Sequence, residues 1–397
     1  MRWLARLRRA AIVVGVVGVV GVVGAVVAPA PARADGLHHR LSLAGGGELY
    51  ATPGFNGHGF FLVRYDLDGL PRESHLSVEL NTDTLRVSYW GLRVGRFELG
   101  VAAAGEVLIA GILSDYYRNG VNDPGRGFWA SYATAGGSAK LNLAPHFLEL
   151  AAGARRWFFS RAGATNAALV LPPDAWVGEV RLRYTLWMLD PDRSLWEPQR
   201  LFPRLRGVAL GVELGLDARS EVAPWGARDP SVFAPTDLRN DPSRAIFSAR
   251  QWLRAGAKLH ARLRLQIDES ASWMWGADDL VRARIGGLNP YSIPLVGAPW
   301  ADYLADDFAA ADVSLHVRVA GEHEVGVLVD GVVLDDVYRT GGPTARVGAL
   351  AGIGAFADLR IGAWQLDVRG GWSPTVRVGS VAGGFTLFAS AGWDWSR

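Results

Sequence analysis

The sequence predicts an all-β fold, a transmembrane antiparallel β-barrel of about 16 strands (14–16). Three observations lead to this prediction: an amino-terminal export signal, long segments in which apolar and polar residues alternate, and aromatic residues near the ends of those segments. Successive side chains of a strand point to opposite faces, so each alternating segment has one apolar and one polar face. In a membrane barrel the apolar face contacts lipid and the polar face lines the lumen.

The composition excludes several classes of protein. The chain has 397 residues and no cysteine, which excludes a disulfide framework, thiolate metal sites and thiol catalysis. Its formal charge of +2 includes five arginines within residues 1–34, so the remainder carries 36 basic and 39 acidic residues. This near balance argues against a nucleic-acid-binding protein. Hydrophobic residues make up 49% of the chain, which excludes a disordered one.

Residues 1–34 have the features of a signal peptide. Met1–Arg9 is basic, Ala10–Ala28 is apolar or glycine without interruption, and Ala32-Arg33-Ala34 fits an A-x-A cleavage site. The apolar run is also long enough to be an uncleaved membrane anchor, and this alternative stays open. In both cases the rest of the chain is exported.

Alternation with period two continues through the body of the chain. Val180–Leu186, Val208–Leu216 and Val313–Val319 each place an apolar residue at every second position. The longest such run, Arg254–Asp268, predicts one strand about 50 Å long at about 3.3 Å per residue. A soluble β-sandwich would show the same alternation. The length of the strands, the export signal and the aromatic residues at strand ends favour the barrel.

The chain is expected to form one domain after the signal peptide. About 363 residues divided among 16 strands gives about 23 per strand and connection, which suits an even-stranded bacterial barrel. We assign residues 35–56 to a short periplasmic N-terminal segment and 57–397 to the barrel, with its first strand over Gly59–Asp66. Long connections, expected to be extracellular loops, fall at Ser114–Gly127, Leu189–Arg204, Arg219–Arg250 and Gly286–Ala309, and short periplasmic turns fall at Ala320–His323 and Leu359–Ala363.

A series of motifs lies between Val281 and Trp395. Arg284-Ile285-Gly286-Gly287 begins a long connection, after which come five strand candidates: Ala311–Val319, Glu324–Leu334, Ala345–Ala357, Trp364–Ser373 and Gly384–Trp395. The second candidate contains Val329-Asp330-Gly331, and the last contains Gly392-Trp393-Asp394-Trp395. In this order the motifs resemble the C-terminal part of the bacterial surface antigen family. That family comprises outer-membrane barrels of the barrel-assembly, translocation-and-assembly and two-partner-secretion types.

The resemblance implies specific roles for these residues. A loop carrying Arg284, Gly286 and Gly287 would fold into the lumen, and its arginine would pair with Asp330 on the wall. Gly392 and Trp395 would mark the strand that closes the barrel. Alternation places Asp330 on the polar face, where a guanidinium and a carboxylate can form a bidentate pair. In a second interpretation, which stays open, Arg284 is one of many lumen arginines and Asp330 pairs with another residue.

The polar face of the 254–268 run carries a row of basic residues. Arg254, Lys258, Arg262 and Arg264, together with His260, could attract anions into the lumen. Alternatively, acidic residues on neighbouring strands neutralise the row; the candidates are Asp312, Glu324, Asp330 and Asp367. Both interpretations stay open.

Residues that could carry catalysis or bind a metal are few. Asp312, Ser314 and His316 include the residue types of a hydrolase. Positions two apart in a strand are separated by about 6.6 Å, too far for a direct proton relay unless other strands complete it. His38 and His39 have no carboxylates at metal-ligand spacing and favour a solvated tail. We therefore expect no catalytic residue, no metal and no cofactor.

The resemblance implies a non-enzymatic outer-membrane protein that functions in protein or lipid translocation or in outer-membrane assembly. A passive channel with a charged lumen and a structural surface barrel are the alternatives. The expected partners are outer-membrane lipid and, during biogenesis, the barrel-assembly machinery, with no nucleic acid among them. The family usually carries periplasmic polypeptide-transport-associated domains before the barrel, and residues 35–56 leave no room for them. A periplasmic accessory protein would then supply them.

Overall fold

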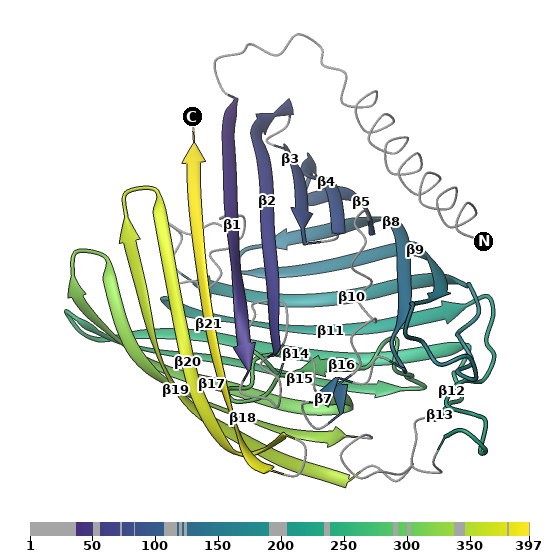
Figure 1. Ribbon diagram of the computed structural model, residues 1–397. Coiled ribbons are helices and arrows are strands. Elements are labelled where there is room, and N and C mark those ends of the chain that lie inside the picture. The colour runs from purple at the N-terminus through teal and green to yellow at the C-terminus, as the bar shows by residue number, and fades with distance from the viewer. Residues whose placement is uncertain are drawn as a thin grey trace.

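Sixteen antiparallel strands form one closed barrel in the computed structural model (Figure 1). The structure describes residues 37–396 except 51–55, 72–73, 83, 107–116, 119–120, 123–124, 190–204, 234–238, 289–292, 300–302, 337–345 and 379–380. The wall strands are β1 (His38–Tyr50), β2 (Asn56–Leu70), β3 (Ser74–Asn81), β4 (Thr84–Val94), β5 (Phe97–Glu106), β8 (Phe128–Leu143), β9 (His146–Arg161), β10 (Trp176–Leu189), β11 (Gly207–Arg219), β14 (Ala245–His260), β15 (Leu263–Trp275), β17 (Tyr303–Ala320), β18 (His323–Asp336), β19 (Arg346–Ile361), β20 (Trp364–Val378) and β21 (Val381–Ser396).

Five short strands among the described residues are not part of the closed wall. They are β6 (Tyr117–Arg118), β7 (Val121–Asn122), β12 (Trp225–Gly226), β13 (Arg239–Asn240) and β16 (Ala283–Ile285). The first two pair with each other, as do β12 and β13, whereas β16 pairs with the wall strand β17. All of them belong to connections between wall strands.

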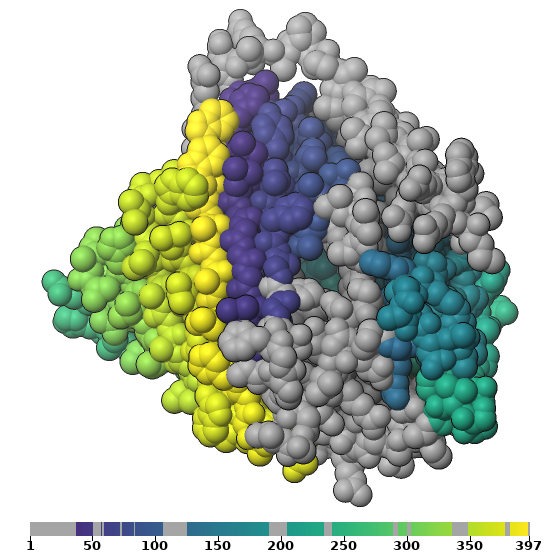
Figure 2. Space-filling model, viewed as in Figure 1, coloured from purple at the N-terminus to yellow at the C-terminus, as the bar shows by residue number. Residues whose placement is uncertain are grey.

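The first and last wall strands close the barrel. Strand β1 pairs with β21 from Arg40 opposite Ser396 to Tyr50 opposite Thr386. Figure 2 shows the two strands side by side, β1 in purple and β21 in yellow. Closure leaves no edge strand with unpaired backbone groups, as a membrane barrel requires. The predicted transmembrane barrel of about 16 strands is therefore confirmed.

The two faces of the wall have the predicted polarity. On β10 and β11 the aliphatic side chains of Val180, Leu182, Val212 and Leu214 are exposed on the outer surface. The residues between them, including Arg181 and Glu213, point into the lumen, where they form ion pairs. The apolar outer face continues around the barrel; for example, it includes Leu43, Val63, Val101, Leu150, Val317, Val327, Ile353, Val368 and Leu387.

The assignment of residues 35–56 to a periplasmic segment is wrong for His38–Tyr50, because these residues form β1 of the wall. The predicted first strand at residues 59–66 lies within β2. The glycine triplet Gly45-Gly46-Gly47 interrupts the alternation of β1 and hides the strand. Glycine is required at position 46, since a Cβ there would lie 2.4 Å from the carbonyl oxygen of Ala389 on β21. The predicted signal peptide, residues 1–34, lies outside the described residues.

The prediction of a single strand from Arg254 to Asp268 is also wrong. The run folds into a hairpin, β14 and β15, that turns at Ala261-Arg262. From Phe247–Trp275 to Lys258–Arg264, residues of equal parity pair across this hairpin, for example Ala255 with Ile267, so they share a face of the sheet. The register shifts between Lys258 and His260, just before the two-residue turn, and this shift lets the alternation in the sequence run on from β14 into β15. No Gly, Pro, Asn or Asp marks the turn.

The connections differ in length at the two ends of the barrel. Turns of two residues join β4 to β5, β8 to β9, β14 to β15, β17 to β18 and β19 to β20, all at the end where β1 begins and β21 finishes. Long connections join β5 to β8, β9 to β10, β11 to β14 and β15 to β17 at the other end, which we take as extracellular. Three connections depart from this division. Two residues join β3 to β4 and β20 to β21 at the long-loop end. The β10–β11 connection, predicted to be an extracellular loop, joins its strands at the end of the short turns.

Two further structural observations concern helices and metal ligands. The described residues contain no helix that is long and apolar enough to cross a membrane. Within the same ranges no group of three or more His, Cys, Asp or Glu side chains is placed to hold a metal ion.

A designed disulfide tests barrel closure. A Cβ at Gly392 would lie 3.8 Å from the Cβ of Ala44 across the β1–β21 pair, a typical separation for a disulfide. We expect Ala44→Cys with Gly392→Cys to cross-link on oxidation, measured as a mobility difference between oxidised and reduced denatured protein. The natural chain has no cysteine, so no other disulfide can form within the variant. Ala44→Cys with Ser390→Cys, out of register by two residues, is the matched control; equal cross-linking of both pairs would contradict the register.

Candidate functional site

The β15–β17 connection enters the lumen and packs against one side of the wall. Its strand β16 pairs with β17, and the chain then turns inward at Gly286 and Gly287, whose φ angles of 127° and 84° favour glycine. Ile285, Leu295 and Val296 are fully buried. Residues 286–298 are hereafter called the lumen loop. Burying an aliphatic side chain of this size contributes about 1.5–3 kcal/mol, so the described part of the loop, residues 286–288 and 293–298, is firmly packed.

Three lumen side chains bind backbone amides of the lumen loop. The carboxylate of Glu48 on β1 accepts a hydrogen bond from the Leu288 amide. On β18, Asp330 accepts one from the Val296 amide at 2.6 Å. On β21, the Thr386 hydroxyl oxygen accepts one from the Gly297 amide at 3.0 Å. The loop is thus held by its backbone at three points on the wall.

Glycines in the wall allow the lumen loop to lie directly on the sheet. A Cβ at Gly352 on β19 would lie 2.7 Å from the Cβ of Val296, and one at Gly371 on β20 would lie 2.5 Å from its Cγ1. A Cβ at Gly384 on β21 would lie 2.0 Å from the Gly297 carbonyl oxygen. These contacts are too short for any side chain larger than hydrogen, so the wall is shaped for the loop.

The structure places the predicted lumen-loop residues as follows. Gly286 and Gly287 are buried in the lumen, and Asp330 faces it with only 2% of its surface exposed. The partner of Asp330 is the Val296 amide, and Arg284 lies in β16 opposite Leu304. The ion pair between Arg284 and Asp330 remains a prediction. Sequence reasoning missed Glu48 and Thr386 as loop anchors.

The predicted closing-strand residues lie on β21 at its junction with β1. Gly392 pairs with Ala44 on the lumen face, and Trp395 pairs with Leu41 on the outer face. Trp395 and Trp364, both exposed, lie on the outside near the end of the short turns. An aromatic residue at this height suits the membrane interface.

The predicted basic row is divided between two strands. Arg254 on β14 pairs with Asp268 on β15 at 3.1 Å, and Lys258 lies opposite Arg264. Arg262 is in the turn and exposed. Arg264 extends across β17 to Glu324 on β18, with 2.5 Å between Nη2 and Oε2. Of the two interpretations, these contacts favour neutralisation, because Arg254 and Arg264 each have a carboxylate partner.

Ser314, His316 and Glu324 have the contacts of a hydrolase triad, but the group is buried and its carboxylate is paired with an arginine. The Ser314 hydroxyl is 3.1 Å from His316 Nε2, and His316 Nδ1 is 3.3 Å from Glu324. However, Arg264 Nη2 lies 3.1 Å from the same Nδ1 and also binds Glu324, so the carboxylate that would orient the histidine is already paired with a guanidinium. Ser314, His316 and Glu324 are at most 6% exposed, which leaves no access for a substrate from solvent. The buried group is a structural network.

The opposite wall, formed by β5 and β8–β11, is lined by charged pairs that are partly exposed. Arg183 bridges Glu149 and Glu213 at 3.0 and 2.5 Å, and Arg181 binds Asp217 at 2.5 Å. Lys140 pairs with Glu98 at 2.6 Å. Opposite charges alternate around this wall, so it attracts neither cations nor anions as a whole.

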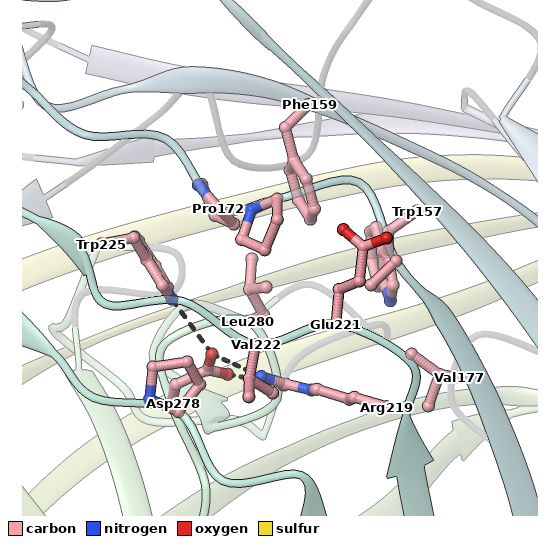
Figure 3. A pocket seen from close by; sticks show the side chains of 13 residues that line it. Trp157, Phe159, Pro172, Val177, Arg219, Glu221, Val222, Trp225, Asp278 and Leu280 are labelled. Atoms are coloured by element: carbon pink, nitrogen blue, oxygen red, sulfur yellow. Dashed lines mark hydrogen bonds and ion pairs between the residues drawn. The ribbon is translucent and has the colours of Figure 1, made fainter.

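Extracellular connections pack together over the long-loop end of the barrel. Trp225 and Phe233 of the β11–β14 connection belong to a buried apolar cluster with Phe128 and Phe159, which lie near the ends of the wall strands β8 and β9. Beside it lies a pocket lined by aromatic and proline side chains, with Arg219 and Glu221 among its polar residues (Figure 3). The pocket therefore lies among the β9–β10, β11–β14 and β15–β17 connections.

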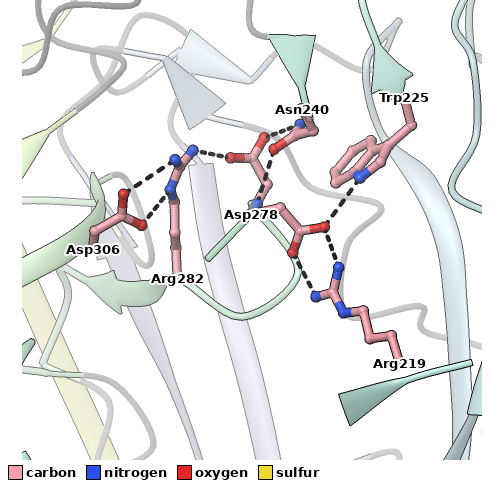
Figure 4. A network of polar contacts seen from close by, with 7 residues as sticks. Arg219, Trp225, Asn240, Asp278, Arg282 and Asp306 are labelled. Carbon is pink, nitrogen blue, oxygen red and sulfur yellow. Dashed lines mark hydrogen bonds and ion pairs between the residues drawn. The ribbon is translucent and has the colours of Figure 1, made fainter. Parts of the chain in front are cut away.

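A polar network fixes these connections to the wall and to the base of the lumen loop (Figure 4). Arg219 binds both oxygens of buried Asp278 at 2.7 and 2.8 Å, and the Trp225 indole donates to the same carboxylate at 3.1 Å. Asp279 accepts from Asn240 at 3.0 Å and from Arg282 at 2.7 Å. Arg282 also binds Asp306 on β17.

Comparison with known proteins gives structural matches but no sequence match. The sequence matches no protein-family profile and no curated protein. BamA from Haemophilus ducreyi lacking POTRA domains 1–3 is similar, with a TM-score of 0.56 and 11% identity over 88% of this chain and 70% of that one. CdiB from Escherichia coli gives 0.55 and 11% over 89% and 63%, and CdiB from Acinetobacter baumannii gives 0.50 and 12% over 90% and 60%.

At these identities the likeness concerns the fold. The chain spans about 60–70% of the length of these three structures. Together with the closed barrel and its apolar outer face, the fold decides the location of the protein. The chain is a bacterial outer-membrane β-barrel.

Proposed function

We propose that this barrel functions in protein or lipid translocation or in outer-membrane assembly and is related to the surface antigen barrels. The observation that carries the proposal is the lumen loop, which Glu48, Asp330 and Thr386 bind through its backbone. Passive diffusion does not require a buried segment that is fitted to glycines of the wall and fills part of the lumen. The fold similarity to BamA and CdiB supports the same proposal.

The three anchors distinguish the lumen loop from a loop that merely narrows a pore. Val296 and Leu288 join a buried cluster with Phe60, Leu328, Phe356 and Phe388 from four wall strands. Moving the loop therefore exposes apolar side chains and leaves three buried acceptors without their amides. We infer that the loop is displaced only when a cargo or partner replaces these contacts.

A passive channel is the second candidate, and one observation favours it. The β8–β11 wall keeps its charged side chains partly exposed beside the lumen, as a water-filled pathway would. The pairing of opposite charges predicts weak ion selectivity for such a channel.

Comparing a deletion strain with its parent separates the two candidates. If the barrel translocates or assembles, its loss should deplete particular proteins or lipids from the outer membrane while the uptake of small hydrophilic solutes stays unchanged. The measurement is quantitative comparison of outer-membrane protein and lipid content together with solute uptake. Slower uptake with unaltered membrane composition would contradict the proposal and support the channel. The wild-type gene supplied in trans is the control.

A further inference from the structure

Two consecutive arginines of β9 each lie over aromatic rings, Arg155 in the lumen and Arg156 on the outer surface. Arg155 and Arg156 are consecutive on β9 and therefore point to opposite faces of the wall. In the lumen, Arg155 lies over the rings of Tyr132 and Trp157 at 5.4 and 5.5 Å and pairs with Glu179 at 2.9 Å. Its charge is thus balanced by a carboxylate.

On the outer surface, Arg156 also contacts two aromatic rings, but among the described residues it has no carboxylate partner like the Glu179 that pairs with Arg155. Its guanidinium lies over Phe158 and Trp176 at 5.8 and 5.6 Å. Within the described part of the chain no carboxylate is in ion-pair distance of Arg156 and no side chain accepts its N–H groups. Ring contacts occupy the faces of a guanidinium, so its edge donors stay available for an oxyanion.

The height of Arg156 places it at the outer border of the lipid belt. Ten residues separate it from His146, the first residue of β9 after the short turn. At about 3.3 Å per residue and a tilt of about 40°, this distance corresponds to about 25 Å along the barrel axis, the height of the apolar band. His146 and Tyr184, hydrogen-bonded at 2.8 Å, lie at the opposite border. Trp176, 55% exposed, is the interfacial aromatic residue beside Arg156.

We propose that Arg156, Phe158 and Trp176 form a binding site for the phosphate group of an outer-leaflet lipid. The carboxylate of Glu179 balances the charge of Arg155, and the lipid phosphate balances the charge of Arg156. A guanidinium binds a phosphate through two parallel N–H···O contacts. The rings of Phe158 and Trp176 lie at the level where the headgroup meets the acyl chains. Small residues on the outer face of β8–β10 lie beside Arg156 (Ala133) and below it (Ala154 and Gly178), and an acyl chain can lie against them.

Native mass spectrometry of the full-length protein tests the site with purified phosphorylated lipid A. We expect Arg156→Gln to weaken binding about tenfold, equivalent to about 1.4 kcal/mol. Arg155→Gln, the same substitution one residue away on the lumen face, is the matched control and should leave binding unchanged. Trp176→Ala should weaken binding as well, and Arg156→Lys should restore part of it.

The alternatives give different results. Equal loss in the Arg155 and Arg156 variants, or unchanged binding in Arg156→Gln, would overturn the proposal. So would equal binding of lipid A without phosphate, which would indicate apolar contact alone. Competition by inorganic phosphate at the lipid's own concentration would identify a free-anion site rather than a lipid site. Heat-dependent electrophoretic mobility of each variant confirms that the barrel has folded, and Trp176→Ala keeps the test available if Arg156→Gln does not fold.

Discussion

Removal of residues 288–297 is expected to convert a closed barrel into a conducting one. The lumen loop fills the space beside β18–β21 and β1, and a 16-stranded barrel without such a plug encloses an aqueous channel. The ends of the deletion are adjacent, because the Gly287 amide donates to the Ala298 carbonyl at 3.1 Å. An Asn-Gly turn can therefore replace the loop without straining β16.

Planar-bilayer recordings measure the effect. We expect the wild-type protein to show small, intermittent currents and the deletion variant a steady current at least about tenfold larger, as for an open barrel of this size. Glu48→Gln, Asp330→Asn and Thr386→Val combined keep the volume of the loop but weaken its anchors, so transient openings are expected. A wild-type current as large and steady as that of the deletion variant would contradict a plugged lumen.

Arg264→Gln is expected to destabilise the barrel strongly. Arg264 and Glu324 are 8% and 4% exposed, and their contact at 2.5 Å spans β17. Removing one member of a buried ion pair typically costs about 3–5 kcal/mol, because the remaining charge loses its partner. The measurement is urea-induced unfolding of the purified barrel in detergent or lipid, followed by tryptophan fluorescence.

The turn provides a matched control for this substitution. Arg262→Gln removes the same charge two residues earlier, where the side chain is exposed, and should shift the unfolding midpoint by less than about 0.5 kcal/mol in equivalent free energy. Similar effects of both variants would show that the pair contributes little. Ion selectivity should change little in either variant, since the lumen charges are paired.

The sequence predicted the barrel because the strand period is a local property. Alternation between a lipid face and a lumen face is visible within a few residues, as in Val208–Leu216, and it correctly placed Asp330 on the lumen face. The five C-terminal strand candidates all correspond to wall strands, β17–β21. Alternation does not show where one strand ends and the next begins when apolar residues stay at every second position through a turn, as they do at Ala261-Arg262.

The contacts of the lumen loop could not be read from the sequence. Glu48 is more than 200 residues away from Leu288 and lies after a glycine triplet that hides its strand. Thr386 resembles any other polar residue on a lumen face. The amide donors that they bind belong to the backbone, which has no sequence signature. Only closure of the barrel, which brings β1 beside β21, places these acceptors on one surface.

The positions of the anchors have a mechanical consequence. Glu48 belongs to the first strand and Thr386 to the last, so the amides of Leu288 and Gly297 fasten one short segment to both sides of the joint between them. Separating the first and last strands would strain or break the hydrogen bonds that Glu48 and Thr386 accept from the lumen loop. Separation of β1 from β21 and release of the lumen loop are therefore coupled, because the same segment is bound to both strands.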